Sequence, residues 1–134
     1  MKNIRGENNM AVNESAENYL ETILILSKRL PVVRSIDIVN ELGFKKSSIS
    51  IAMKNLREKK HITVTDAGFI YLTDTGREIA EMIYERHELI SSWLVRLGVS
   101  EKIAAEDACK IEHVISKESF EALKRHVGAS SDKI

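Results

Sequence analysis

Two short β-rich runs interrupt a chain whose other segments have the spacing of amphipathic helices. The runs cover residues 62–65 and 69–72, and Asp66, Ala67 and Gly68 join them. A connection of three residues that contains glycine is typical of a β-hairpin with a bulge. The sequence therefore predicts a mainly α chain that contains one β-hairpin.

Helical segments precede the hairpin. From Glu14 onward, apolar residues recur at helical spacing until Pro31 ends the pattern. Ser35 and Ser47 are placed to cap a second and a third helix, and Gly43 suits the tight turn between them. The order helix, helix, turn, helix, hairpin is that of a winged helix-turn-helix.

Three further helices are expected after the hairpin. A long helix begins at Thr73 or Asp74, and Gly98 suits its C-terminal turn. Ser100 and Ser116 are placed to cap two more helices, the last of which ends near residue 128. The apolar residues expected to form the core of this region or a dimer seam are Trp93, Leu97, Ile103, Ile111, Ile115, Phe120 and Leu123.

The chain is predicted to have three parts. Residues 1–13 form a polar tail or an extra turn of helix, residues 14–75 the winged helix-turn-helix, and residues 76–134 an all-helical domain. With one cysteine, the chain makes no internal disulfide, which suits a reducing cytoplasm. Charged residues break the apolar stretch 19–33, so no membrane association is expected.

The distribution of charge is uneven, although the net charge is zero. Residues 28–60 contain nine basic and three acidic side chains, a balance of +6, whereas residues 61–134 have a balance of −4. A basic block beside an acidic remainder favours one surface that binds a polyanion and another with a different role. An ordinary solvated face would have the same charge, so charge alone leaves both interpretations open.

The third helix is the expected recognition helix for double-stranded DNA. Its apolar stripe consists of Ile49, Ala52, Met53 and Leu56, which turns the hydroxyl and basic side chains outward. Ser50 can approach base edges closely, Ile51 can touch a thymine methyl group, and Lys54 can reach a base or phosphate. The candidate DNA-binding residues are Arg34, Lys45, Lys46, Ser47, Ser48, Ser50, Ile51 and Lys54, and Lys59 and Lys60 flank the helix as further candidate phosphate contacts. The hairpin lacks Lys and Arg, so little phosphate affinity is expected from it.

A second constellation suits a metal ion. Cys109, Glu112 and His113 recur at i, i+3 and i+4, so they share one face of a predicted helix. A thiolate, a carboxylate and an imidazole together suit a first-row transition metal better than a hard cation. Further ligands must come from other helices, and the candidates are Asn18, Glu21 and His87.

Four runs resemble the DtxR/MntR-type metal-dependent repressors: residues 17–23, 72–77, 86–89 and 106–116. The resemblance extends over about residues 14–127. It implies a homodimer of winged-helix domains joined through helical dimerisation domains, with Fe²⁺ or Mn²⁺ between them. Such a protein represses metal-uptake genes by binding a palindromic operator. Co²⁺, Zn²⁺ and Ni²⁺ are expected to substitute in vitro.

The resemblance also implies a ligand set. The residues at family ligand positions are Glu21, His87, Cys109, Glu112 and His113. Cys109 is typical of iron-type members, whereas Glu21 is typical of manganese-type members. Asn18 stands where the family usually has Asp or Met, and Ser91 and Ala105 stand where iron-type members hold ancillary ligands. We therefore expect a hybrid site in a chain of manganese-type length, without the SH3-like third domain of many iron-type members.

Two alternatives remain open at this stage. The first is a DNA-binding regulator whose degenerate sensor no longer depends on metal, which Asn18 allows. The second is a small metalloenzyme or a Cys–His nucleophile, because Cys109 and His113 are one helical turn apart. No motif for an oxyanion hole or a phosphate loop accompanies them, so neither catalysis nor a small-molecule substrate is expected.

Overall fold

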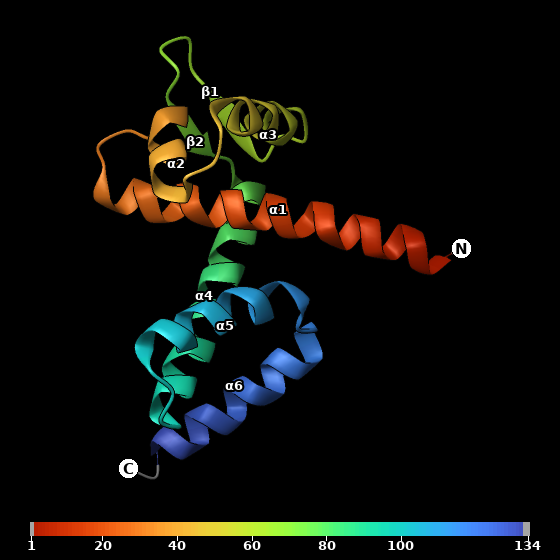
Figure 1. Ribbon diagram of the computed structural model, residues 1–134, viewed down its shortest axis with the longest axis vertical. Helices are drawn as coiled ribbons and strands as arrows, with labels where there is room; N and C mark the ends of the chain where they lie inside the picture. The colour runs from red at the N-terminus through yellow and green to blue at the C-terminus, as the bar shows by residue number, and fades with distance from the viewer. Residues whose placement is uncertain (1, 133–134) are drawn as a thin grey trace. The chain divides into compact units, whose positions relative to one another are not determined.

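The structure is a computed structural model that describes residues 2–132, with side chains for residues 14–128 (Figure 1). In order, the described elements are α1 (Lys2–Arg29), α2 (Ser35–Leu42), α3 (Lys46–Glu58), β1 (Ile62–Val64), β2 (Ile70–Leu72), α4 (Asp74–Arg96), α5 (Glu101–Val114) and α6 (Lys117–Asp132). The fold is mainly α, as predicted. The chain divides within α4 into two compact units, Met1–Met82 and Ile83–Ile134. None of the described helices is long and apolar enough to cross a membrane.

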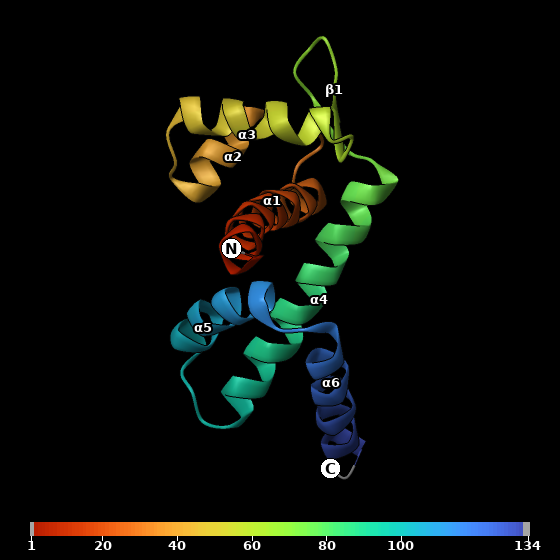
Figure 2. The ribbon, with the colours of Figure 1, turned by 90° about the vertical axis from the view of Figure 1, so that its right-hand side faces the viewer.

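In the first unit, α2, α3 and the hairpin lie on the same side of α1 (Figures 1 and 2). Its core consists of Leu20, Ile23, Leu24, Leu26, Val33, Ile38, Ile49, Met53, Leu56, Ile62, Ile70 and Ala80, all at most 5% exposed. The helix predicted from Glu14 already begins at Lys2. Once a helix nucleus has formed, each further residue needs no new nucleation, so the apolar spacing from Glu14 onward does not decide where the helix begins.

The caps of α2 and α3 differ from those predicted. Arg34 is the N-cap of α2, so the prediction for Ser35 was off by one residue. The backbone N–H of Arg34 donates to Asp37 Oδ2 at 2.8 Å. Ser47 is not the cap of α3, because the extended backbone that an N-cap requires is that of Lys45, with φ −69° and ψ 145°. Gly43 ends α2 in the left-handed region, as expected.

The hairpin agrees with the prediction. β1 and β2 pair antiparallel, with Thr63 opposite Tyr71. The connection closes through hydrogen bonds from Thr65 N to Phe69 O and from Gly68 N to Thr65 O, each 2.9 Å. Gly68 has a φ of 84°, which favours glycine. The N–H of Ile70 also donates to Val33 O at 2.8 Å, which joins the hairpin to the segment after α1.

In the second unit, α5 and α6 flank the C-terminal part of α4 (Figures 1 and 2). Both predicted serine caps are present: Ser100 Oγ accepts from Ile103 N at 3.4 Å, and Ser116 Oγ accepts from Ser119 N at 3.1 Å. α6 continues to Asp132, beyond its predicted end near residue 128. Phe120 is buried, whereas Leu97 is 63% exposed. Of the apolar residues predicted for core or seam, Leu97 and Ile103, which is 45% exposed, thus lie on the surface of the single chain.

Candidate functional site

α3 turns two different faces to its surroundings, as its spacing predicted. Ile49, Met53 and Leu56 are at most 5% exposed. On the other side, all candidate DNA-binding residues of the helix are exposed: Lys46, Ser47, Ser48, Ser50, Ile51 and Lys54. Hydroxyl and ammonium groups held in this way on a rigid helix can approach the groove of a duplex without rearrangement of the core.

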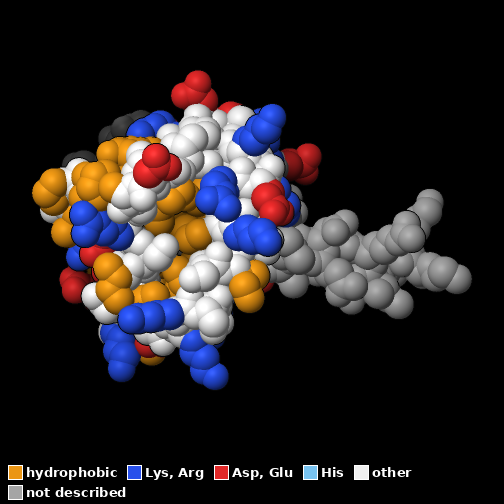
Figure 3. All heavy atoms as spheres, turned by 90° about the horizontal axis from the view of Figure 1, so that it is seen from above, with side chains coloured by type: hydrophobic (Ala, Val, Ile, Leu, Met, Phe, Trp, Pro, Cys, Tyr) orange, Lys and Arg blue, Asp and Glu red, His pale blue; other side chains and the backbone are white. Residues whose placement is uncertain are grey.

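The side of the first unit that carries α2, α3 and the hairpin is rich in cations. Figure 3 shows Lys and Arg side chains spread over this side, with hydrophobic side chains gathered between them. The exposed large apolar residues of these segments are Ile36, Phe44, Ile51 and Tyr71. Ile36 and Val39 of α2 line a groove of about 280 Å³ together with Lys46 and Ser50 of α3. The groove places two candidate DNA-binding side chains beside apolar surface.

Arg34 is held against the hairpin. Its guanidinium carbon lies 4.8 Å from the centre of the Phe69 ring, a cation–π arrangement. The hairpin itself lacks cationic side chains from Ile62 to Leu72. Arg34 therefore brings a positive charge beside the loop end of the hairpin, next to Phe69.

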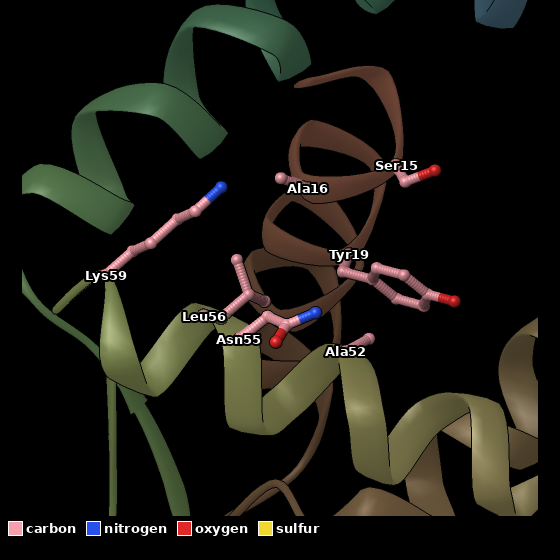
Figure 4. A pocket seen from close by; sticks show the side chains of 7 residues that line it. All are labelled: Ser15, Ala16, Tyr19, Ala52, Asn55, Leu56 and Lys59. Atoms are coloured by element: carbon pink, nitrogen blue, oxygen red, sulfur yellow. The ribbon is translucent and has the colours of Figure 1, made fainter. Parts of the chain in front are cut away.

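Another groove lies between α1 and α3 (Figure 4). It has a volume of about 390 Å³ and is lined by Ser15, Ala16, Tyr19, Ala52, Asn55, Leu56 and Lys59. Figure 4 shows Lys59 and Tyr19 on opposite sides of it. Helical spacing puts Ala52, Leu56 and Lys59 on a different face of α3 from Ser47 and Lys54. The groove thus lies away from the predicted base-contacting side chains, although Lys59, a candidate phosphate contact, is among the residues that line it.

The predicted metal-ligating residues of α5 come together. One ligand atom from each of Cys109, Glu112 and His113 lies within 4.8 Å of the others. Cys109 is exposed, whereas Glu112 is 0% exposed. Glu112 continues the buried stripe of Ala104 and Ala108 at steps of four residues, so it occupies a position where an apolar side chain would be expected.

Two imidazoles contact the buried carboxylate of Glu112. His87 of α4 has its Nδ1 2.9 Å from Glu112 Oε2, and His113 has its Nε2 3.3 Å from Oε1. Within the described part of the chain, Oε1 accepts no hydrogen bond. A buried carboxylate is costly unless its charge is compensated, and a divalent cation compensates it directly. A thiolate, a carboxylate and two imidazoles form a donor set that fits a first-row transition metal.

Asn18 and Glu21, the other two predicted ligands, lie on α1 in the first unit. Glu21 is 6% exposed, so α1 also carries a buried carboxylate. Asn18 is partly buried, and its backbone carbonyl accepts a hydrogen bond from Thr22 Oγ1 at 2.8 Å. The second unit therefore brings Cys109, Glu112 and His113 together and places His87 against Glu112.

Sequence reasoning missed Arg86, which precedes His87. Its side chain is buried, and its Nη1 donates to the backbone carbonyls of Glu112 and Ile115 at 3.1 and 2.8 Å. The only sequence signal was a basic residue in the middle of a helix beside a candidate ligand. Helical spacing could not reveal that this residue is enclosed by α5 and α6.

Comparisons with known proteins match both units. Two protein-family models match the chain. Residues 11–66 match the family described as the iron dependent repressor, N-terminal DNA binding domain. Residues 73–132 match the family described as the iron dependent repressor, metal binding and dimerisation domain. An uncharacterised HTH-type transcriptional regulator of Methanocaldococcus jannaschii is 33% identical over 92% of this chain and 100% of that protein. The transcriptional regulator MntR of Escherichia coli is 30% identical over 83% of this chain and 72% of that protein.

A solved structure shows the same fold. A manganese-dependent transcriptional repressor in complex with manganese matches with a TM-score of 0.77 and 25% identity. The match covers 84% of this chain and 52% of the other, so the chain spans about half the length of that repressor.

Proposed function

The chain belongs to the DtxR/MntR-type family of metal-dependent transcriptional regulators, and we propose that it represses metal-uptake genes when Fe²⁺ or Mn²⁺ is bound. The observation that carries the metal-dependent part is the fully buried carboxylate of Glu112, which both His87 and His113 contact. The protein would act in the cytoplasm as a homodimer on operator DNA.

Six side chains would hold the metal. His87, Cys109, Glu112 and His113 supply donors from the second unit. Glu21 and Asn18 on α1 would complete the set from the DNA-binding unit, a role supported by the burial of the Glu21 carboxylate and by the family resemblance. When bound, the metal supplies positive charge that compensates the buried carboxylates of both units. The side chains of α1 and α5 would thereby hold the DNA-binding unit in one orientation.

DNA binding would follow from the exposed face of α3. Ser47, Ser50 and Ile51 would meet base edges in the major groove. The cationic side chains that would contact phosphates are Arg34, Lys45, Lys46 and Lys54. Two copies of α3 in a dimer fit half-sites about one helical turn, or a multiple of it, apart. A coupling free energy of about 1–3 kcal/mol between metal and operator is enough for a switch.

The homodimer would use apolar surface of the second unit. Val95, Leu97, Ile103 and Val114 are each at least 39% exposed in the single chain. Exposed apolar side chains on one unit are typical of a surface that a partner covers. The name of the matching family model, a metal binding and dimerisation domain, supports the same role.

The proposal is tested by an anaerobic titration in which the protein is added to the DNA that lies upstream of its own coding sequence. Fluorescence anisotropy would follow binding in EDTA and with Mn²⁺, Fe²⁺, Co²⁺ or Zn²⁺. Metal is expected to tighten binding by about 5- to 150-fold. Glu112→Ala and His113→Ala should lose this response, whereas Glu106→Ala, which removes an exposed carboxylate from the same helix, should keep it.

The same titration separates the proposal from its alternatives. Tight DNA binding that ignores every metal would favour the degenerate, metal-independent regulator. A metal response that survives Glu112→Ala and His113→Ala would show that the metal binds elsewhere. Absence of specific DNA binding under every condition would contradict the role of α3.

A further inference from the structure

Arg86 is a buried cation at the junction of three helices. It belongs to α4 and is 8% exposed. Its Nη1 donates to Glu112 O at 3.1 Å and to Ile115 O at 2.8 Å, and both carbonyls lie at the C-terminal end of α5. Its guanidinium carbon also lies 5.5 Å from the ring centre of Phe120 in α6. One side chain thus connects α4 to both following helices.

The two hydrogen bonds fall on the segment that presents the candidate ligands. The last turn of an α-helix leaves carbonyls without partners inside the helix, and a cation there also interacts favourably with the helix dipole. In α5, this last turn carries Glu112 and His113. His87, which contacts Glu112 Oε2, directly follows Arg86 in α4. Arg86 therefore holds the two ligand-bearing segments at a fixed distance and rotation.

Stability alone is a poor explanation for this arrangement. Among the described residues, the Nε of Arg86 is buried without a hydrogen-bond partner. A buried cation with an unsatisfied donor loses hydration that the protein only partly replaces, and well-packed apolar residues often stabilise a core equally well. Alignment of two helices explains a guanidinium at this position better, because an apolar side chain could not donate hydrogen bonds to the backbone carbonyls of Glu112 and Ile115.

We propose that Arg86 is a positioning residue for the metal centre: it fixes the last turn of α5 against α4 so that Glu112 and His113 face His87 before metal arrives. This inference rests on the proposed metal site and adds a residue outside the ligand set. Groups that orient metal ligands typically contribute about 10- to 100-fold to metal affinity.

The sign of the effect distinguishes positioning from simple electrostatics. A permanent positive charge near a divalent cation opposes binding, so loss of that charge alone would raise metal affinity. Loss of the two hydrogen bonds instead frees the last turn of α5 and lowers the affinity. The proposal therefore requires that the affinity falls when Arg86 is replaced by an apolar residue of similar length.

The test uses Co²⁺ with the full-length protein and three variants. Arg86→Met removes the charge and both hydrogen bonds, and Arg86→Lys keeps the charge but loses the planar fork of donors. Lys124→Met is the matched control, because it removes another cation that joins α4 to α6, through a 2.7 Å contact with Glu85, without touching α5. Co²⁺ affinity is measured by titration, and Cys109 ligation is followed by the thiolate-to-cobalt absorption band. Hydrogen exchange of the metal-free proteins reports on the last turn of α5.

Arg86→Met is expected to weaken Co²⁺ binding by about 10- to 100-fold and to shift the absorption band. It should also speed hydrogen exchange at the end of α5 without metal. Arg86→Lys should show a smaller loss, and Lys124→Met should change affinity less than twofold. The exchange measurement separates positioning from a general loss of stability, which would speed exchange throughout the unit.

Three results would overturn the inference. Wild-type or higher affinity in folded Arg86→Met would show that positioning does not limit binding. If Arg86→Met does not fold, an unchanged affinity and exchange pattern in Arg86→Lys would have the same meaning. If the wild-type protein itself does not bind Co²⁺, the proposed metal site fails first, and this inference fails with it.

Discussion

The exposed face of α3 and the cluster around Glu112, which consists of Glu112, His87, Cys109 and His113, are two different ways for a helix to present the side chains of a proposed site. On α3, the apolar stripe anchors the helix and leaves Ser47, Ile51 and Lys54 in solvent. On α5, the stripe itself ends in a proposed metal ligand, because Glu112 follows Ala108 and is 0% exposed. The first arrangement separates stability from function, whereas the second places both demands on the same side chain.

This difference has a consequence for substitutions. Exposed side chains away from special contacts usually change stability by less than about 0.5 kcal/mol, so α3 can change its DNA contacts and remain folded. A buried carboxylate is different, because its desolvation opposes folding until its charge is compensated. The cluster around Glu112 should therefore trade stability for metal binding, and α3 should not.

The largest effect is expected for Glu112→Leu, which tests this trade directly. The change should lower metal affinity by more than about 100-fold, since loss of a ligand costs more than loss of a residue that orients one. The metal-free protein should keep its stability or gain about 1 kcal/mol, because an apolar side chain of similar size avoids the buried charge. Urea unfolding of metal-free protein and a Co²⁺ titration measure the two effects.

A control separates burial from charge. Glu106→Leu changes an exposed carboxylate on the same helix and should leave both quantities nearly unchanged. A large loss of stability in metal-free Glu112→Leu would show that the carboxylate stabilises the fold through His87 and His113. It would contradict the expectation that this buried carboxylate opposes folding when no metal is bound.

A smaller change is expected from the double substitution Asn18→Asp and Cys109→Glu, which alters the proposed ligand chemistry rather than removing it. Mn²⁺ is harder than Fe²⁺, Co²⁺ or Zn²⁺ and prefers oxygen to sulfur. One carboxylate would replace the thiolate, and another would add a negative charge from α1. We expect Mn²⁺ affinity to rise by about tenfold, equivalent to 1.4 kcal/mol, and Mn²⁺-dependent DNA binding to rise with it.

The single variants identify the contributions. Cys109→Glu alone tests the softness of the donor, and Asn18→Asp alone tests whether α1 takes part. If Asn18→Asp leaves the affinity for every metal unchanged, α1 contributes no ligand at this position. The dimer should persist in each variant, which analytical ultracentrifugation can check.

The two regions also differ in how far the sequence predicted them. The exposed face of α3 follows from helical spacing alone, because a stripe of Ile49, Met53 and Leu56 leaves only one side for solvent. The same spacing predicted that Cys109, Glu112 and His113 share one helix face, and their ligand atoms do lie within 4.8 Å of one another. It could not predict that Glu112 is buried, because burial depends on which helix packs against that face.

The predicted N-caps agree with the structure only at helices whose first turn donates a hydrogen bond to the cap side chain. Ser100 and Ser116 accept hydrogen bonds from the first turns of α5 and α6, as expected. α3 begins without a side-chain cap at Lys45, so the serine pattern after it was misleading. Arg86 was missed for a related reason: its carbonyl partners are backbone atoms, and no sequence pattern marks them.

On α3, the prediction concerns salt dependence more than affinity. Lys46→Ala and Lys54→Ala each remove one exposed cation from the candidate DNA interface. Each lost phosphate contact should reduce the slope of log affinity against log salt by about 0.9, with unfolding free energy within about 0.5 kcal/mol of wild type. Lys102→Ala, an exposed lysine of α5, is the matched control. An unchanged slope in both α3 variants would contradict the assigned interface.

The smallest effect is expected at an exposed ion pair of the second unit. This pair tests whether the effect of a charge on stability depends on its burial or only on the unit in which it lies. Lys124 Nζ lies 2.7 Å from Glu85 Oε1, and this hydrogen bond, with the negative charges of Glu85 and Glu121, raises the pKa of Lys124 above its usual 10.5. Because folding favours the charged form, the stabilisation is present at neutral pH and is lost as the pH rises through the raised pKa.

Lys124→Met should therefore lower the melting temperature slightly at pH 8, and the difference from wild type should shrink above pH 10.5 and in high salt. A double-mutant cycle with Glu85→Gln isolates the pair. If the coupling free energy between Lys124 and Glu85 does not fall in high salt, this exposed pair behaves like a buried one. Burial would then not explain the difference between this pair and the cluster around Glu112.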